Sequence, residues 1–265
     1  MAAASRRALL ALDFDGVLFD SAPECYWVAR GTADGRDPTD PPPDAEAIRR
    51  DPGFAAFLAW MPLGNRAEDF GVALRGIAAG ERPADQDGYD AFKARCGAAW
   101  QEDFHRRFYT WRGALAAAHP EAWLALMRPY PGVGAALRRL AARFELAIAT
   151  SKDRASVRAV LGAHGLDALF AEQRILDKET GRSKAAHLRE LCARSGLAPE
   201  AAVFVDDKVN HLDRVAPLGV HCALAAWGYN GGRERALARR RGYLVWGLAD
   251  FETGLAALGD RIAGP

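Results

Sequence analysis

Residues 8–16 read ALLALDFDG, and this stretch decides the fold of the chain. After Arg7, residues 8–12 form a short apolar segment that stops abruptly at Asp13, where an acidic turn containing Gly16 begins. An apolar run bounded in this way is typical of a buried parallel strand that delivers side chains to a site at its carboxyl end. We therefore predict a strand over residues 7–12 and a functional site that begins at Asp13.

The composition is that of a globular protein with little net charge. The chain has 265 residues, and 50% of them are hydrophobic, which suffices for a buried core. A net charge of +1 favours neither nucleic acid nor an anionic membrane as a partner, so any binding of anions has to be local. The apolar run at 8–12 is shorter than the ~7–15 residues of a signal-peptide core, and no stretch approaches the ~20 apolar residues of a membrane span. We expect a cytoplasmic protein.

Two different sequence patterns divide the chain into segments. From residue 22 to residue 128, Ala, Arg and Trp recur at helical spacing, interrupted by a proline-rich loop at 37–44. From Pro129 onward, apolar runs alternate with amphipathic segments, which predicts a parallel sheet with helical crossovers. We therefore expect an α/β core domain (1–21 and 129–265) with an inserted all-helical cap domain (22–128). Expected strands cover 145–149, 201–205, 220–226 and 243–246, and expected helices cover 133–143, 154–164 and 184–195.

Asp13 and Asp15 form a pair of carboxylates directly after the first strand. Residues two apart in an extended chain point to the same side, so both can converge on one ligand, and Gly16 lets the backbone approach that ligand closely. One carboxylate can attack phosphorus while the other acts as general acid and base, and together they attract a hard cation. The alternative is an acidic turn that caps the next helix.

Asp206 and Asp207 end a second apolar run, Val203 to Val205. Two adjacent carboxylates at a strand end repel each other unless a cation neutralises them. A Mg²⁺ site is therefore the favoured interpretation, and simple capping of the following turn is the alternative.

Two further features suit a phosphate group. Thr150-Ser151 follow an expected strand, where a hydroxyl and an adjacent backbone N–H can bind phosphate oxygens, although both residues are also common helix caps. Lys184 begins an expected helix, where a cation is unfavourable unless a phosphate or the Asp13 carboxylate holds it. Lys178 is the competing lysine.

Taken together, these segments resemble the motifs of the haloacid dehalogenase (HAD) superfamily. The run from Asp13 to Ser21, DFDGVLFDS, resembles the first motif, DxDG(T/V). Thr150 resembles the hydroxyl residue of the second motif, Lys184 the lysine of the third, and Val205-Asp206-Asp207 the acidic fourth. The resemblance implies a Rossmann-like core, an aspartyl-phosphate intermediate and Mg²⁺ as cofactor.

The position of the cap, between the first and second motifs, resembles the phosphoglycolate phosphatase-like branch of that superfamily. Residues 20–24 and 129–133 are similar to the same branch. Two departures stand out: the cap is long for the type, and the fourth motif has Asp206-Asp207 where many relatives have Gly-Asp followed by a later Asp. Asp207 then aligns with the usual metal ligand, and Asp206 is a second carboxylate.

The resemblance implies a Mg²⁺-dependent phosphohydrolase that acts on a small phosphorylated metabolite. Asp13 would be the nucleophile and Asp15 the acid and base. The phosphoryl group would be held by Thr150, Ser151 and Lys184, and the metal by Asp13, Asp15, Asp206 and Asp207. We expect neither nucleic acid nor a membrane as a partner, and the oligomeric state is open. A phosphomutase of the same fold and a non-catalytic binding or regulatory module are the alternatives; a dehalogenase is disfavoured because its counterpart lacks the second carboxylate.

Other signals carry less weight. Gly132-Val133-Gly134 lacks the preceding strand and third glycine of a dinucleotide loop. The histidines show no metal-ligand spacing, so we expect His187 and His211 to be surface or capping residues, with His211 at the border of the site. The cap arginines at 66, 107 and 112 could hold the non-reacting part of a substrate.

Overall fold

A computed structural model describes residues 8–64, 66–181 and 183–263 of the chain. The chain divides into two compact units. The core unit contains the residues up to Asp20 and those from Pro129 onward, and the helical unit is Ser21–Arg128. Arg7, expected to open the first strand, lies outside the described residues.

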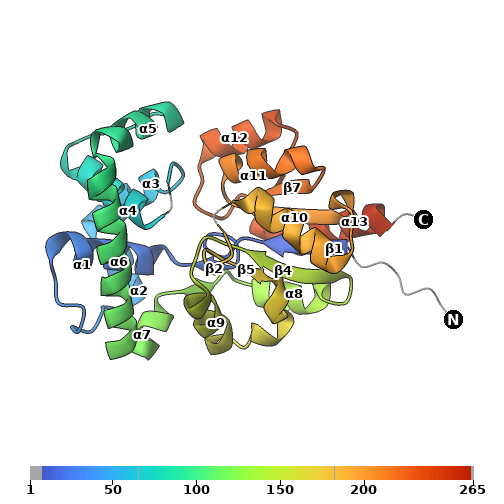
Figure 1. Ribbon diagram of the computed structural model, residues 1–265, viewed down its shortest axis with the longest axis horizontal. Coiled ribbons are helices and arrows are strands. Elements are labelled where there is room, and N and C mark those ends of the chain that lie inside the picture. The colour runs from blue at the N-terminus through green and yellow to red at the C-terminus, as the bar shows by residue number, and fades with distance from the viewer. Residues whose placement is uncertain (1–7, 65, 182, 264–265) are drawn as a thin grey trace. The chain divides into compact units, whose positions relative to one another are not determined.

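A six-stranded parallel sheet forms the centre of the core unit (Figure 1). Its order, β5-β4-β1-β6-β7-β8, places β1 between β4 and β6. The carboxyl ends of these three strands therefore meet at one edge of the sheet. The strands are β1 (Ala8–Leu12), β4 (Phe144–Ala149), β5 (Ile175–Leu176), β6 (Ala202–Asp206), β7 (His221–Ala225) and β8 (Leu244–Trp246).

Helices cover both faces of this sheet (Figure 1). Local sequence explains where they begin and end: the Ser183 side chain accepts a hydrogen bond from the backbone of Ala186 at the start of α10, and Gly196, with φ of 63°, ends that helix. The helices are α8 (Val133–Leu140), α9 (Arg154–Ala163), α10 (Lys184–Ser195), α11 (Val209–Val215), α12 (Gly232–Arg240) and α13 (Phe251–Ala263). Short 3₁₀ turns span Asp167–Leu169, Glu172–Arg174, Pro199–Ala201, Ala216–Leu218 and Leu248–Asp250.

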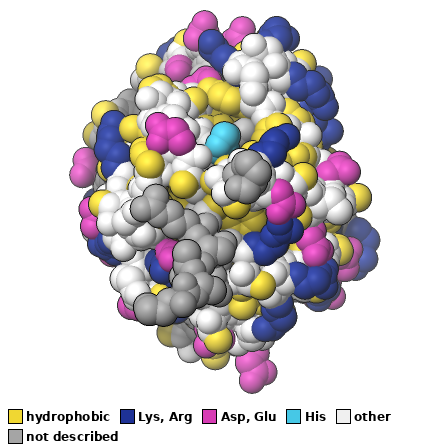
Figure 2. All heavy atoms as spheres, turned by 90° about the vertical axis from the view of Figure 1, so that its right-hand side faces the viewer, with side chains coloured by type: hydrophobic (Ala, Val, Ile, Leu, Met, Phe, Trp, Pro, Cys, Tyr) yellow, Lys and Arg dark blue, Asp and Glu magenta, His cyan; other side chains and the backbone are white. Residues whose placement is uncertain are grey.

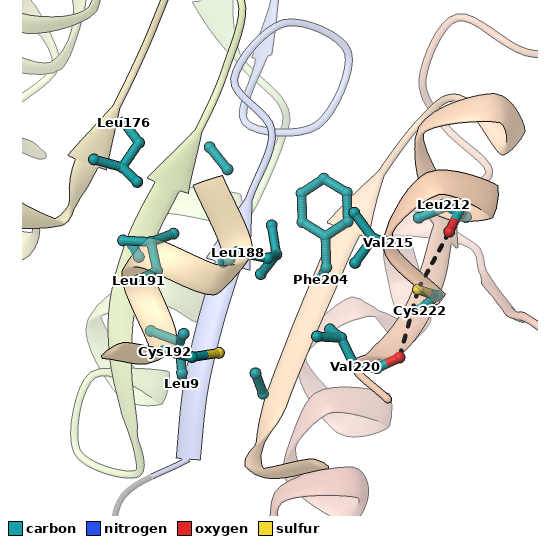
Figure 3. Close-up of a cluster of buried hydrophobic side chains, with 14 of the residues drawn as sticks. Leu9, Leu176, Leu188, Leu191, Cys192, Phe204, Leu212, Val215, Val220 and Cys222 are labelled. Carbon is teal, nitrogen blue, oxygen red and sulfur yellow. Dashed lines mark hydrogen bonds between the residues drawn. The ribbon is translucent and has the colours of Figure 1, made fainter. Parts of the chain in front are cut away.

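β1 is buried along its whole length because both of its faces are covered. Alternate side chains point to opposite faces, so Leu9 and Ala11 share one face. On that face, Leu9 and Phe204 of the sheet belong to one buried apolar cluster with Leu188 and Cys192 of α10 (Figure 3). Burying one such Leu or Phe contributes about 1.5–3 kcal/mol. This packing holds the strand ends and α10 in fixed relative positions.

The chain leaves the core unit after Asp20 and re-enters it at Pro129. The backbone N–H of Tyr130 donates to the carbonyl of Leu18 over 3.0 Å. A separate two-stranded sheet pairs β2 (Phe19–Asp20) with β3 (Arg128–Pro129). The exit and the re-entry of the chain are therefore adjacent.

The helical unit is built from helices alone between residues 22 and 125, within the part of the chain that the structure describes. The proline-rich stretch 37–44 contains neither helix nor strand, as its sequence predicts. The helices are α1 (Ala22–Asp34), α2 (Ala45–Arg49), α3 (Pro52–Trp60), α4 (Ala67–Ala78), α5 (Gln86–Arg95), α6 (Ala98–Ala118) and α7 (Pro120–Ala125). Among the described residues, no helix is both long and apolar enough to cross a membrane.

A hollow of about 570 Å³ lies at the amino end of β7 and β8. It is lined by His221 and Leu244 at the starts of these strands and by Arg261 near the end of α13. Figure 2 shows the side of the molecule on which α13 ends, where apolar side chains lie between basic and acidic ones. This hollow is at the edge of the sheet opposite to the predicted site.

Candidate active site

The order of the three central strands brings the predicted site residues together. Asp13 follows β1, Thr150 follows β4, and Asp206 ends β6. The pairing is in register, because Leu12 of β1 lies opposite both Ile148 and Val205. The backbone N–H of Asp13 continues the ladder by donating to the Val205 carbonyl over 2.9 Å. All three side chains are nearly inaccessible to solvent.

Lys184 lies at the centre of this group. Its Nζ is 2.8 Å from Asp13 Oδ1 and 3.4 Å from Asp206 Oδ2, and it donates to the Ala149 carbonyl over 2.6 Å. The lysine side chain is only 3% exposed, so its charge requires these partners. The competing Lys178 instead lies 4.0 Å from Glu179 and is partly exposed. Lys184 is therefore the lysine that contacts the first carboxylate.

Burial and neighbouring charges set the protonation of the acids. Burial raises the pKa of Asp13 to about 7 although Lys184 opposes the rise, and the Asp206 carboxylate adds to it. Burial would also raise the pKa of Asp206, but His211 and Lys184 outweigh it and hold that pKa well below its usual range. Burial dominates at Asp207, whose pKa is raised despite the nearby Lys208. Burial therefore disfavours the ionised forms of Asp13 and Asp207, and a bound cation would offset this cost.

Asp15 extends from the same turn toward a different lysine. Lys152 Nζ lies 3.1 Å and 3.4 Å from the two carboxylate oxygens of Asp15. The intervening Phe14 points into the core, where its ring stacks on Phe19 at 4.6 Å between centroids. Lys152 is the main site residue that the sequence analysis missed. Its only signal is a position two residues after Thr150, just past a strand end.

Gly16 is required by close packing as well as by its backbone angle. Its φ is +82°, a conformation that favours glycine. A Cβ atom at this position would lie 2.5 Å from Asp207 Oδ2, and one at Gly228 would lie 2.4 Å from Asp207 Cβ. The Asp207 side chain is therefore enclosed between two glycines.

The two acids of the fourth motif have different surroundings. Asp206 accepts hydrogen bonds from the Lys208 backbone and contacts His211 Nδ1 with both oxygens, at 3.1 and 3.0 Å. Asp207 Oδ2 accepts from the Tyr229 backbone N–H over 2.7 Å. Its Oδ1 is buried and has no hydrogen-bond partner among the described residues. An orphaned buried carboxylate oxygen of this kind is what a cation would satisfy.

Ligand atoms of Asp13, Asp206 and His211 lie within 4.8 Å of one another. The carboxylates of Asp13 and Asp206, together with the orphaned Asp207 Oδ1, offer oxygen donors of the kind that a hard divalent cation such as Mg²⁺ prefers, while His211 Nδ1 is engaged with Asp206. His211 borders the site, as expected. His187, however, is only 3% exposed, so the expectation of a surface or capping residue was wrong for it: α10 turns this position toward the protein interior.

The hydroxyl residues of the second motif also differ. Thr150 is buried, and its Oγ1 accepts from the backbone N–H of Lys152 over 3.1 Å. Ser151 is exposed and lies outside the buried cluster.

In the helical unit, each arginine named above has an acidic partner within that unit: Arg66 pairs with Glu68, Arg107 with Asp103, and Arg112 with Glu24.

Comparisons with known proteins show which family the chain belongs to. The model of the haloacid dehalogenase-like hydrolase family matches residues 8–213, which is more than half of the chain. The chain therefore belongs to the haloacid dehalogenase-like hydrolase family. It is an enzyme of that family, and its relatives lie on the phosphoglycolate phosphatase-like branch.

Two curated relatives and one solved structure represent this branch. Phosphoglycolate phosphatase of Synechococcus elongatus is 30% identical over 109 residues, which cover 40% of this chain and 50% of that protein. Phosphoglycolate phosphatase 1 of Pseudomonas aeruginosa is 28% identical over 234 residues, covering 86% of this chain and 72% of that protein. The crystal structure of a predicted phosphoglycolate phosphatase from Haemophilus somnus has a TM-score of 0.63 and 22% identity, and the match covers 96% of this chain and all of that one. The solved structure shares the fold.

Proposed function

We propose that this chain is a Mg²⁺-dependent phosphohydrolase that releases phosphate from a small phosphorylated metabolite through an aspartyl-phosphate at Asp13. One observation carries the proposal: the buried Asp13 carboxylate lies 2.8 Å from Lys184 Nζ, with the carboxylate of Asp15 two residues further on. The lysine favours the ionised, nucleophilic form of Asp13. Asp15 is partly exposed, with 23% of its side chain accessible, so it can reach a substrate.

The first half-reaction forms a bond between Asp13 and phosphorus. An oxygen of Asp13 attacks the phosphorus in line, and the bond from phosphorus to the leaving oxygen breaks. Asp15 gives its proton to that oxygen, which would otherwise leave as an alkoxide. Lys184 and Thr150 are suited to hold the transferring group, because Lys184 contacts Asp13 and Thr150 follows the neighbouring strand β4, and both are buried.

The second half-reaction restores the enzyme. Asp15, now a carboxylate, takes a proton from a water molecule that attacks phosphorus, and the bond between phosphorus and Asp13 breaks. Asp15 thus acts first as acid and then as base. A C–Cl dehalogenase has no use for such a residue, which favours phosphate chemistry over that alternative.

The cation would be held by Asp13, the backbone carbonyl of Asp15, Asp207 and Asp206. Its fit rests on the orphaned Asp207 Oδ1 and on the burial that, with the neighbouring Asp206 carboxylate, raises the pKa of Asp13. When bound, Mg²⁺ offsets the repulsion between these carboxylates and the phosphate.

The helical unit is proposed to act as a cap that selects the substrate. Because the two curated relatives are named phosphoglycolate phosphatases, 2-phosphoglycolate is the first compound to test, within a panel of small phosphoesters. Location in the cytoplasm stays a prediction from the sequence.

The panel is assayed for released inorganic phosphate, with Mg²⁺ and with a chelator. We expect Mg²⁺-dependent release from at least one small phosphoester and none from Asp13→Asn, whose amide cannot attack phosphorus. Intact-mass analysis of Asp15→Asn should find a phosphate adduct, since its second half-reaction is slowed. A phosphomutase would instead convert a sugar phosphate into its isomer with little free phosphate. Near-normal activity of Asp13→Asn would contradict the mechanism.

A further inference from the structure

Two buried lysines lie beside the two carboxylates of the first motif. Lys184 contacts Asp13, and Lys152 contacts Asp15. The side chain of each lysine is only 3% exposed, and they come from different segments, the start of α10 and the turn after β4. The family resemblance accounts for Lys184 alone, which leaves Lys152 without a role.

The backbone of Lys152 is fixed on both sides. Its N–H donates to Thr150 Oγ1 over 3.1 Å, and its carbonyl accepts from the N–H of Lys178 over 3.3 Å. The next residue, Asp153, caps α9 by accepting from the Ser156 backbone over 2.9 Å. The side chain therefore starts from a fixed point beside the second motif.

The path of the side chain is equally constrained. Lys152 Nζ lies 5.9 Å from the centroid of the Phe14 ring, which is completely buried. A buried ammonium needs an anionic partner, and Asp15 supplies it with both oxygens. Contact with both oxygens restricts rotation of the carboxylate as well as its position.

We propose that Lys152 is a positioning residue that fixes the orientation of the Asp15 carboxylate for proton transfer, an inference that rests on the proposed function. Asp15 has to present one oxygen first to the leaving group and then to water. Since its side chain is partly exposed, packing alone does not fix it. Lys152 fixes it by connecting the first motif to the turn of the second.

The strongest test is a double-mutant cycle on Asp15 and Lys152. Lys152→Met keeps an unbranched side chain of similar length but removes the charge. If Lys152 acts only through Asp15, Lys152→Met should slow the wild-type enzyme but have almost no further effect in an Asp15→Asn background. A loss in the Asp15→Asn background as large as in the wild type would overturn the proposal.

Leaving-group dependence separates positioning from phosphate binding. Phenyl phosphate needs a proton on its leaving oxygen far more than 4-nitrophenyl phosphate does. General acid catalysis contributes about 10²–10⁴-fold, so we expect Lys152→Met to lose roughly tenfold more kcat/KM with phenyl phosphate than with 4-nitrophenyl phosphate. An equal loss with both esters, accompanied by weaker inhibition by inorganic phosphate, would mean that Lys152 binds the phosphoryl group directly and would overturn the proposal.

The matched control is Arg154→Met. Arg154 carries a positive charge two residues away, but it pairs with Asp177 and Glu172 rather than Asp15. The Arg154→Met variant should leave the ratio of the kcat/KM values for the two esters unchanged. Lys152→Arg keeps the charge and should recover part of that ratio, which also provides a second variant if Lys152→Met does not fold.

Failure of this proposal is distinguishable from failure of the proposed function. If Asp15→Asn accumulates the Asp13 adduct while Lys152→Met behaves like the wild type, only the assignment of Lys152 is wrong. If no variant forms an adduct, the covalent route itself is wrong.

Discussion

His211 Nδ1 lies 3.0 Å from Asp206 Oδ2 and 3.1 Å from Asp206 Oδ1. His211 lies in the first turn of α11 (Val209–Val215), five residues after Asp206. This contact restricts the orientation of the Asp206 carboxylate beside Asp13. His211 therefore holds one of the proposed cation ligands in position.

We therefore predict that His211→Ala weakens Mg²⁺ binding by about tenfold or more, since residues that orient metal ligands typically contribute this much. Isothermal titration calorimetry with Mg²⁺ measures the effect. His221→Ala is the matched control, because His221 contacts the Glu200 carbonyl at the opposite edge of the sheet. Unchanged Mg²⁺ affinity in His211→Ala would show that Asp206 needs no such support.

The two acids of the fourth motif should differ in their effect on the cation. Asp207 Oδ1 has no partner among the described residues, whereas both Asp206 oxygens are engaged. We predict that Asp207→Asn weakens Mg²⁺ binding more than Asp206→Asn does, by calorimetry on folded protein. The reverse order would make Asp206 the principal ligand.

A pH dependence of stability is expected from His187. Burial and the nearby Lys184 lower its pKa to about 4, while the unfolded chain binds a proton near pH ~6.5. The native pKa is the lower one, so the stabilisation is complete above about pH 6.5 and is lost as the pH falls toward about 4. Urea unfolding of His187→Leu should show a shallower decrease of the unfolding free energy over this range than the wild type, by roughly 2 kcal/mol. The same pH dependence of the unfolding free energy in His187→Leu and in the wild type would contradict the prediction.

The helical unit contains a buried ion pair with a strong expected effect on stability. Arg112 Nε donates to Glu24 Oε1 over 2.6 Å, and the Trp123 indole N–H donates to the same oxygen over 3.0 Å. Arg112→Met leaves the Glu24 charge buried without its cation, which should cost about 3–5 kcal/mol. Arg106→Met, at an exposed position of the same helix, should change stability by less than about 1 kcal/mol. Chemical unfolding measures the free energy of unfolding of both variants. A similar decrease in both would show that the buried ion pair contributes no more to stability than the exposed one.

Sequence alone predicts those site residues that follow directly from strand ends. Asp13, Thr150 and Asp206 come from apolar runs whose carboxyl ends must meet in a parallel sheet. Lys184 is predicted as well, because a lysine at the start of a helix needs an anionic partner. The departure of the fourth motif, Asp206-Asp207, is visible in the sequence, but the contact of His211 with Asp206 is not.

The remaining features depend on packing that no local pattern records. Lys152 reaches Asp15 only because Phe14 is turned into the core and the turn after β4 is fixed. β5 has two residues, too few for any periodicity. α12 is rich in arginine and buries only Ala238, so it shows almost no apolar face.

The adjacency of Leu18 and Tyr130 has a consequence for how such an enzyme can diversify. Because a backbone hydrogen bond joins the two ends of the insertion, and because the entropy of closing a loop grows only slowly with its length, insertions of different length can begin and end at the same two points of the core. We therefore expect that the segment between Asp20 and Pro129 can be exchanged without displacing β1, which precedes Asp13. If the helical unit selects the substrate as proposed, the residues that carry out the chemistry and those that choose the substrate lie in separate segments of the chain, and either set can change without the other.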